Sequence, residues 1–232
     1  DTDTGIAGDN ITRAPIPEII GQTDPGSSVV IRINGEEYSV VANAQGDYSL
    51  AIPSLGNGDY QYTITATDTA GNVTGYIAGG DVDDNAAATA TITVDRQAPV
   101  LTAQLLAVSD TGISSTDGIT SDNTPTITGT ITGEFNQVYL TLNLIQYSIT
   151  PDVDGNWSIT LPELTDGFHN YQVYAADIAG NDVTVQNSLQ IKTGIEFTTR
   201  LENDTGIRND DFLTNDNTLS FTGTTEPDNT IV

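Results

Sequence analysis

Apolar and polar side chains alternate along most of this chain with a period of two residues. The segments Val29–Ile33 and Tyr60–Ala66 are examples, and both are rich in the β-branched and aromatic residues that suit a pleated surface. No run of ten or more residues has the spacing of an amphipathic helix. The pattern therefore predicts an all-β protein.

Turn-forming pairs interrupt the apolar runs roughly every 8 to 12 residues, the spacing typical of sandwiches of short strands. They are Asn34-Gly35, Gln45-Gly46, Asn57-Gly58, Asp154-Gly155 and Asp166-Gly167. About seven strands then fit into each hundred residues, and we expect them to form two packed antiparallel sheets.

An internal repeat sets the domain organisation. Asp-Thr-Gly begins at positions 3, 110 and 204; Gly46–Ser49 matches Gly155–Ser158, and Asp68–Asn72 matches Asp177–Asn181. Because these matches keep one order, we predict an elongated array of tandem immunoglobulin-like β-sandwich domains. The expected domains are 1–97, 98–193 and 194–232, the last a truncated domain because its copy stops after a second predicted strand.

Composition limits the classes of function that the chain could have. The chain has 32 acidic and six basic residues, a formal net charge of −26, and neither cysteine nor methionine. Such a charge repels nucleic acid and anionic membranes, whereas 37% hydrophobic residues argue against disorder. No apolar stretch approaches a membrane span, so we expect no membrane insertion. The lack of oxidisable sulfur favours a secreted or cell-surface protein, and we expect a monomer.

Strand directions predict where the acids lie. The Asp-Thr-Gly loop, between the first and second strands, and the turn before the sixth strand belong to one end of a domain. The Asp-x-Ala-Gly-Asn turn belongs to the other end, beside the exit of the preceding domain. At the boundary between the first two domains this brings together Asp3, Asp9, Asp59, Asp95, Asp177 and Asn181, with Asp152 or Asp154 as further members.

Oxygen ligands of this kind point to calcium, which takes six to eight of them, rather than to zinc or copper. The candidate ligands are Asp3, Asp9, Asp59, Asp68, Asp95, Asp110, Asp117, Asp154, Asp166, Asp177 and Asp204. Two carboxylates about 4 Å apart repel by roughly 4 kcal/mol at an effective dielectric near 20, so a shared cation would stiffen the junction. The alternative is that Asp-Gly and Asp-Asn only form turns.

The second junction, Ile191–Glu196, contains neither Asp nor Ala-Pro, so we expect a weaker or differently built site there. Its acids would be Asp110, Asp117 and Asp166. The acidic insertion Gly80–Asn85 could bind another calcium ion, although a solvated loop is favoured.

Together these motifs resemble the bacterial immunoglobulin-like repeats of giant non-fimbrial adhesins exported by type I secretion, the SiiE-type adhesins of Salmonella above all. The resemblance rests on Asp-Thr-Gly, Thr124–Thr130, Gly155–Trp157 and the Ala-Asp-x-Ala-Gly-Asn turn, and it covers the whole chain. It implies a long surface stalk, calcium at the domain junctions, virulence and host-cell contact. The implied junction ligands are Asp3, Asp95, Asp110 and Asp177.

Nothing in the sequence indicates an enzyme. His169, the only histidine, has no evident catalytic partner, and no Ser-His-Asp set or phosphate loop occurs. Trp157 and its counterpart Tyr48 are predicted to anchor the sandwich cores. The leading interpretation is a calcium-rigidified spacer whose partners are neighbouring repeats and, through the parent adhesin, a host receptor or glycan. The alternative is a lectin-like module that itself binds glycan or protein, with Trp157 or several tyrosines on one exposed face.

Overall fold

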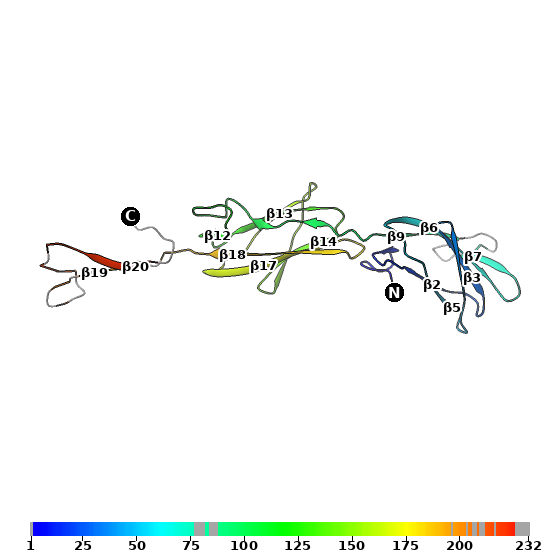
Figure 1. Cartoon of the computed structure of the whole chain (residues 1–232). Coiled ribbons are helices and arrows are strands. Elements are labelled where there is room, and N and C mark those ends of the chain that lie inside the picture. Colours follow the sequence, from blue (N-terminus) through cyan, green and yellow to red (C-terminus); the bar gives the residue numbers. More distant parts are fainter. Residues whose placement is uncertain are drawn as a thin grey trace. The chain divides into compact units, whose positions relative to one another are not determined.

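The computed structural model describes residues 2–76, 82–83, 88–195, 197–202, 204–205, 208, 212–215 and 217–225. Strands, turns and loops account for all of these residues, as the all-β prediction requires (Figure 1). No helix in this part of the chain is long and apolar enough to cross a membrane. The Gly80–Asn85 insertion, apart from the backbone of Val82 and Asp83, lies outside the described residues.

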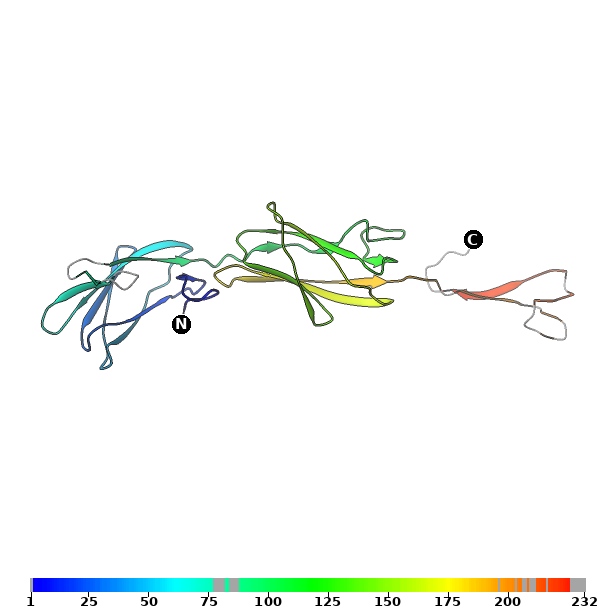
Figure 2. The ribbon, with the colours of Figure 1, turned by 180° about the vertical axis from the view of Figure 1, so that it is seen from behind.

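Nine strands lie in the described part of the first repeat. They are β1 (Ile11–Thr12), β2 (Glu18–Gln22), β3 (Ser28–Ile33), β4 (Glu36–Val41), β5 (Asp47–Ala51), β6 (Gly58–Thr67), β7 (Val73–Tyr76), β8 (Val82–Asp83) and β9 (Ala88–Val94). One sheet has the order β1-β9-β6-β3-β4, with β7 paired to β6 and to β8. Strands β2 and β5 form a separate antiparallel pair (Figure 2).

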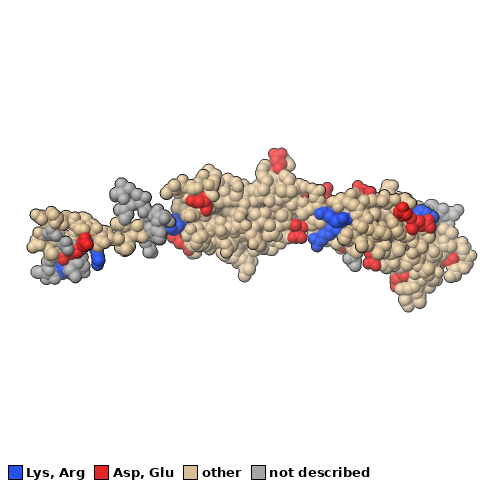
Figure 3. All heavy atoms as spheres, in the orientation of Figure 1, with Lys and Arg blue, Asp and Glu red and all other residues tan. Residues whose placement is uncertain are grey.

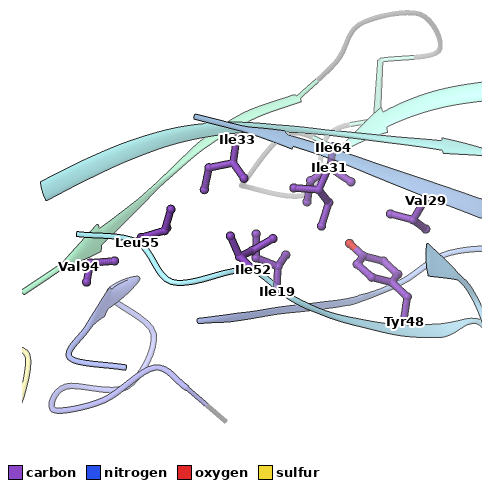
Figure 4. Packing of buried hydrophobic residues seen from close by; sticks show 9 residues of the cluster. All are labelled: Ile19, Val29, Ile31, Ile33, Tyr48, Ile52, Leu55, Ile64 and Val94. Atoms are coloured by element: carbon purple, nitrogen blue, oxygen red, sulfur yellow. The ribbon is translucent and has the colours of Figure 1, made fainter. Parts of the chain in front are cut away.

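The core of the first repeat lies between these two sheets. Ile19, Tyr48 and Ile52 face Val29, Ile31, Ile33 and Ile64 across the gap, and Leu55 and Val94 close one end (Figure 4). Val29 and Ile31 have no exposed surface, and every second residue of β3 is buried. The period-two pattern therefore corresponds to one face of a sandwich, where burial of apolar surface stabilises the fold.

The second repeat has the same plan. Its strands are β10 (Val100–Leu101), β11 (Gln104–Leu105), β12 (Ile119–Thr120), β13 (Thr126–Thr132), β14 (Gln137–Leu142), β15 (Ile145–Ser148), β16 (Asn156–Thr160), β17 (Gly167–Ala176) and β18 (Asp182–Ile191). One sheet is β10-β13-β11 with β16 beside β13, and the other is β12-β18-β17-β14-β15. Two further strands, β19 (Phe197–Leu201) and β20 (Phe221–Thr225), pair antiparallel.

The expectation of purely antiparallel sheets needs one correction. Strand β1 pairs parallel to β9, and β12 pairs parallel to β18. Each of these two-residue strands lies within an Asp-Thr-Gly loop and runs in the same direction as the last strand of its repeat. The parallel pair covers an edge that would otherwise be open.

Trp157 is buried with 3% of its surface exposed, as the core prediction required, and Tyr48 is buried at 9%. This burial contradicts the lectin alternative in the form that used Trp157 as an exposed sugar platform. The matched glycines explain how both rings fit: a Cβ at Gly21 would overlap the Tyr48 ring, and a Cβ at Gly129 would overlap the Trp157 ring. His169 lies on β17 and its Nε2 is 2.7 Å from the Thr165 carbonyl oxygen.

Contacts between Cα atoms divide the chain into two units. The first comprises residues 1–103, 129–158 and 171–186, and the second comprises 104–128, 159–170 and 187–232. The first unit thus contains the whole first repeat together with the Asp177–Asn181 turn of the second. On the face seen in Figure 3, acidic side chains lie in small separate groups instead of one continuous field.

Candidate functional site

Three loops begin with Asp-Thr-Gly and share one internal design: the first loop (3–13), the second loop (110–121) and the third loop (204–215). In each, Oδ2 of the aspartate accepts a hydrogen bond from a backbone N–H further along. These bonds run from Gly8 to Asp3 (2.6 Å), from Gly118 to Asp110 (3.2 Å) and from Phe212 to Asp204 (3.0 Å). The aspartate recurs because it closes the loop.

The threonine closes the same loops from the other side. Its Oγ1 accepts a hydrogen bond from the backbone N–H nine or ten residues later. These bonds run from Arg13 to Thr4 (2.8 Å), from Ser121 to Thr111 (2.8 Å) and from Asn215 to Thr205 (3.3 Å). Arg13, Ser121 and Asn215 therefore occupy equivalent positions, and only the first of them is charged.

The second aspartate oxygen is the unusual atom of these loops. Asp110 is 5% exposed, and its Oδ1 is buried with no hydrogen-bond partner among the described residues; the same holds for Oδ1 of Asp204. A buried charged oxygen without a partner lowers the stability of the folded state by roughly several kcal/mol, unless a cation or a water molecule binds it. An oxygen-seeking cation fits this atom.

Two turns have the sequence Asp-x-Ala-Gly-Asn: the first turn (68–72) and the second turn (177–181). In the second turn the Asn181 backbone N–H donates to Asp177 Oδ1 at 2.8 Å, and its side-chain amide donates to Oδ2 at 2.9 Å. In the first turn Asn72 makes the same two bonds to Asp68, at 2.8 and 2.7 Å. The hydrogen bonds from Asn72 hold the pKa of the Asp68 carboxyl below its ordinary value.

Their surroundings distinguish the two turns. Residues 69–72 of the first turn are exposed. In the second turn Asp177 is 1% exposed, Ala179 is fully buried and Asn181 is 7% exposed. The residues that cover the second turn belong to the first loop, and both segments lie within the first unit.

The first loop donates to three consecutive carbonyl groups of the second turn. Ile6 N–H donates to the Ile178 oxygen at 3.1 Å. Thr4 Oγ–H donates to the Ala179 oxygen at 2.7 Å, and Arg13 Nη1–H donates to the Gly180 oxygen at 2.6 Å. Each of these three carbonyl oxygens therefore accepts a hydrogen bond from the first loop. We call this contact the junction.

Charge and steric fit complete the junction. Arg13 Nη1 lies 3.5 Å from Asp182 Oδ1, with about half of each side chain exposed. Asn181 Nδ2 also donates to the backbone oxygen of Asp95, in the linker, at 3.0 Å. Gly5, at φ +81°, lies so close to the turn that a Cβ there would overlap the Ile178 carbonyl oxygen. Burial, and next the Asp182 charge, raise the pKa of Tyr174 nearby.

The predicted ligands are therefore brought together only in part. The loop of Asp3 meets the turn of Asp177, as strand direction predicted, but most carboxylates bond to their own surroundings. Asp9 accepts from Ile11, Asp59 from Thr93, Asp95 from Gln97, Asp117 from Ile119, and Asp166 from Thr193. Asp154 is exposed, and its backbone N–H donates to Asp152. Among the described residues, no three acidic or histidine side chains gather closely enough to hold a metal ion.

Sequence reasoning missed the residues that form most of the junction: Thr4, Arg13 and Asp182. Thr4 was visible as the constant second residue of the Asp-Thr-Gly repeat. Arg13 is one of six basic residues in a chain with 32 acids, so each of them lies in an acidic environment that can fix its place. No comparable signal marks Asp182, because one acid among many is not distinctive.

Comparison with known proteins gives several similar solved structures. One is a tetra-tandem repeat in the extending region of a large adhesion protein: 21% identity, TM-score 0.38, covering 96% of this chain and 55% of that one. A Ca²⁺-stabilized adhesin that helps an Antarctic bacterium bind ice has 22% identity and a TM-score of 0.42, and the match covers 86% of this chain and 50% of that one. A 1.5-MDa bacterial ice-binding adhesin has 24% identity and a TM-score of 0.39, and the match covers 81% of this chain and 62% of that one. The chain thus spans between 50% and 62% of these structures.

No curated protein matches the chain. A family model described as "Bacterial Ig-like domain" matches it twice, over residues 1–96 and 97–193. These two matches cover both repeats, with their Asp-Thr-Gly loops and Asp-x-Ala-Gly-Asn turns, and leave out only the last 39 residues of the 232. The chain therefore belongs to the bacterial Ig-like domain family.

Proposed function

We propose that this chain is a non-enzymatic spacer segment of a secreted, surface-bound bacterial adhesin, with repeats stiffened by calcium. The junction is the observation that carries the spacer role, because a spacer must transmit orientation from one repeat to the next. Three direct hydrogen bonds, each contributing about 0.5–1.5 kcal/mol, restrain the first loop against the second turn. A flexible linker alone would supply no such restraint.

The parent protein is proposed from the repeat motifs. Their resemblance to SiiE-type adhesins supports export by type I secretion and a role in host-cell contact and virulence, with the receptor bound by other parts of the adhesin. The net charge of −26 agrees with a role that involves neither nucleic acid nor an anionic membrane. Neighbouring repeats are then the partners that these residues themselves contact.

For calcium, the second loop offers the best-supported ligand. The unpaired, buried Oδ1 of Asp110 would bind the ion, and backbone carbonyls of the same loop and water would complete a coordination shell that calcium tolerates. Calcium would supply a charge that offsets the buried carboxylate and so favour the folded loop. Asp204, with the same orphaned oxygen in the third loop, is the second candidate ligand.

Asp110→Asn tests the calcium assignment. Asparagine keeps an oxygen that can accept from Gly118 but carries no charge. We expect millimolar calcium to raise the melting temperature of the wild-type chain, by an amount equivalent to about 2.7 kcal/mol if calcium is at 100 times its Kd. In Asp110→Asn this gain should shrink, while in chelator the variant should be at least as stable as the wild type because it buries no unpaired charge.

Asp117→Asn is the matched control, since Asp117 is exposed and its Oδ1 already accepts from Ile119. It should keep the calcium response of the wild type. The spacer role is tested separately by small-angle scattering of the wild type. A scattering profile that fits repeats joined by freely flexible linkers, with no preferred orientation between them, would reject the spacer role, whatever the melting curves show. Equal melting in calcium and chelator would reject the metal.

A further inference from the structure

The junction itself contains a cation that belongs to the protein. We propose that Arg13 takes the place of a metal ion here, so that this repeat-to-repeat interface forms without calcium and selects a partner turn followed by an acid. The inference rests on the proposed function only in treating the contact as a spacer joint.

The first argument is the use of the acceptors. Calcium would need backbone or carboxylate oxygens with free lone pairs pointing at one place. At the junction the three turn carbonyls already accept from an N–H, an O–H and a guanidinium. Both oxygens of Asp177 accept from Asn181, and the side chain of Asp95 accepts from Gln97 in its own linker. Each of these oxygens therefore already uses one lone pair for a protein donor, and the guanidinium brings the positive charge that an ion would otherwise supply.

The second argument is charge. Arg13 lies 3.5 Å from the Asp182 carboxylate and bonds the carbonyl of Gly180, in the turn that Asp177 begins. Arg13 is the one basic residue in the sequence of the first loop, so without it this loop would bring no positive charge to the Asp182 carboxylate and the turn carbonyls. The guanidinium provides several donors in a fixed plane, and it bonds Gly180 while pairing with Asp182.

The third argument is the contrast with the other loops and turns. Ser121 and Asn215 stand where Arg13 stands, and in the second loop the Asp110 oxygen has no described partner. On the turn side, Val73 follows the first turn where Asp182 follows the second. The pair of Arg13 and Asp182 therefore distinguishes this junction. A loop with an arginine at this position fits the second turn better than the first turn. The first turn, which is followed by Val73, suits loops that carry an uncharged residue there.

Ile6 reports on the junction directly, because its backbone N–H donates to the Ile178 oxygen across the interface. We would measure hydrogen exchange of this amide by NMR on the full chain, in calcium and in chelator. Wild type should protect Ile6 equally in both. Arg13→Ser, which copies Ser121, should speed exchange about tenfold, as expected when a hydrogen bond from a charged group is lost. Arg13→Lys should recover part of the protection.

Asp182→Val, which copies Val73, should speed exchange by a smaller factor, about twofold to fivefold, since a half-exposed ion pair contributes little and the hydrogen bond from Arg13 to Gly180 would remain. The Val29 amide, in the fully buried part of β3, serves as the reference for global opening. The proposal is overturned if chelator alone deprotects Ile6 in the wild type, or if Arg13→Ser leaves Ile6 unchanged. Neither result would alter the Asp110 test, which reads calcium binding in a different loop.

Discussion

At the scale of single residues, Thr4 shows how one side chain can link a local structure to a partner. Its hydroxyl accepts from Arg13 N–H within the first loop and donates to the Ala179 oxygen of the second turn. In the second loop the hydroxyl of the equivalent Thr111 hydrogen-bonds Thr120 and Ser121 of its own loop. The threonine of an Asp-Thr-Gly loop can therefore donate to the carbonyl of a turn that packs against the loop.

Gly5→Ala should open the junction while leaving the repeat cores intact. The added Cβ would overlap the backbone oxygen of Ile178, which cannot rotate away as a side chain could. We expect loss of Ile6 protection in hydrogen exchange and little change at Val29. Gly112→Ala is the control: its φ of +117° is also positive, but a Cβ there meets nothing within 4 Å. It carries the backbone strain without the clash.

Acid should weaken the first turn at a pH set by Asp68. Because hydrogen bonds from Asn72 lower the folded-state pKa of Asp68 below the ordinary aspartate value of about 3.9, the carboxylate stabilises the turn above about pH 4. This contribution is lost as the pH falls through the lowered pKa. A carboxyl NMR titration of the wild type and Asn72→Ala measures it: the Asp68 pKa should rise in the variant. Asp152, whose pKa Asn156 lowers, should stay unchanged.

At the scale of elements, each sandwich depends on a glycine that leaves room for an aromatic ring. In the second repeat β13 carries Gly129, and a Cβ there would meet both the Trp157 ring and the Thr102 backbone oxygen. In the first repeat β2 carries Gly21, where the nearest atoms all belong to the Tyr48 ring. One site is limited by rigid backbone and the other by a side chain that can shift.

Gly129→Ala should therefore destabilise its repeat more than Gly21→Ala destabilises the first. Overpacking costs about 1–3 kcal/mol, and we expect Gly129→Ala near the upper end and Gly21→Ala near the lower. Chemical denaturation followed by Trp157 fluorescence for the second repeat, and by amide exchange of Ile31 for the first, separates the two. Equal losses would mean that the Tyr48 ring is as immobile as the backbone.

The elements themselves were predictable from sequence because sandwich burial imposes a period of two, as β3 illustrates. Strand direction also predicted that the Asp-Thr-Gly loop of one repeat would meet the Asp-x-Ala-Gly-Asn turn of the next. The partners of each carboxylate were not predictable. Asp95 meets the second turn through its backbone oxygen while its side chain bonds Gln97, and composition cannot distinguish those two uses. Whether Asp110 binds calcium stays a prediction.

At the scale of the whole molecule, the formal charge of −26 opposes folding. Arg13–Asp182 and Arg32–Glu37 form ion pairs, but six basic residues cannot pair with 32 acids, so most of the acidic surface is balanced by solvent ions. Salt screens the repulsion between exposed charges that lie more than a Debye length apart.

Sodium chloride should therefore stabilise the chain even when calcium is absent. Raising its concentration from about 20 mM to about 500 mM shortens the screening length to a few ångströms. We expect the melting temperature to rise by about 2–4 °C, corresponding to about 1 kcal/mol for a protein of this size. Calorimetry in chelator measures the effect. A melting temperature that falls with salt would mean that ion pairs outweigh repulsion.

The parallel pairing of β12 with β18 bears on how the second repeat would respond to a pulling force. Strand β18 leads into the residues that follow the repeat, and the N–H groups of Gln190 and Lys192 donate to the Gly118 and Thr120 oxygens. A pull on the chain beyond Lys192 would slide β18 along β12, so these bonds would be loaded at the same moment. Bonds loaded together must break together, whereas a strand peeled from one end loses them one after another.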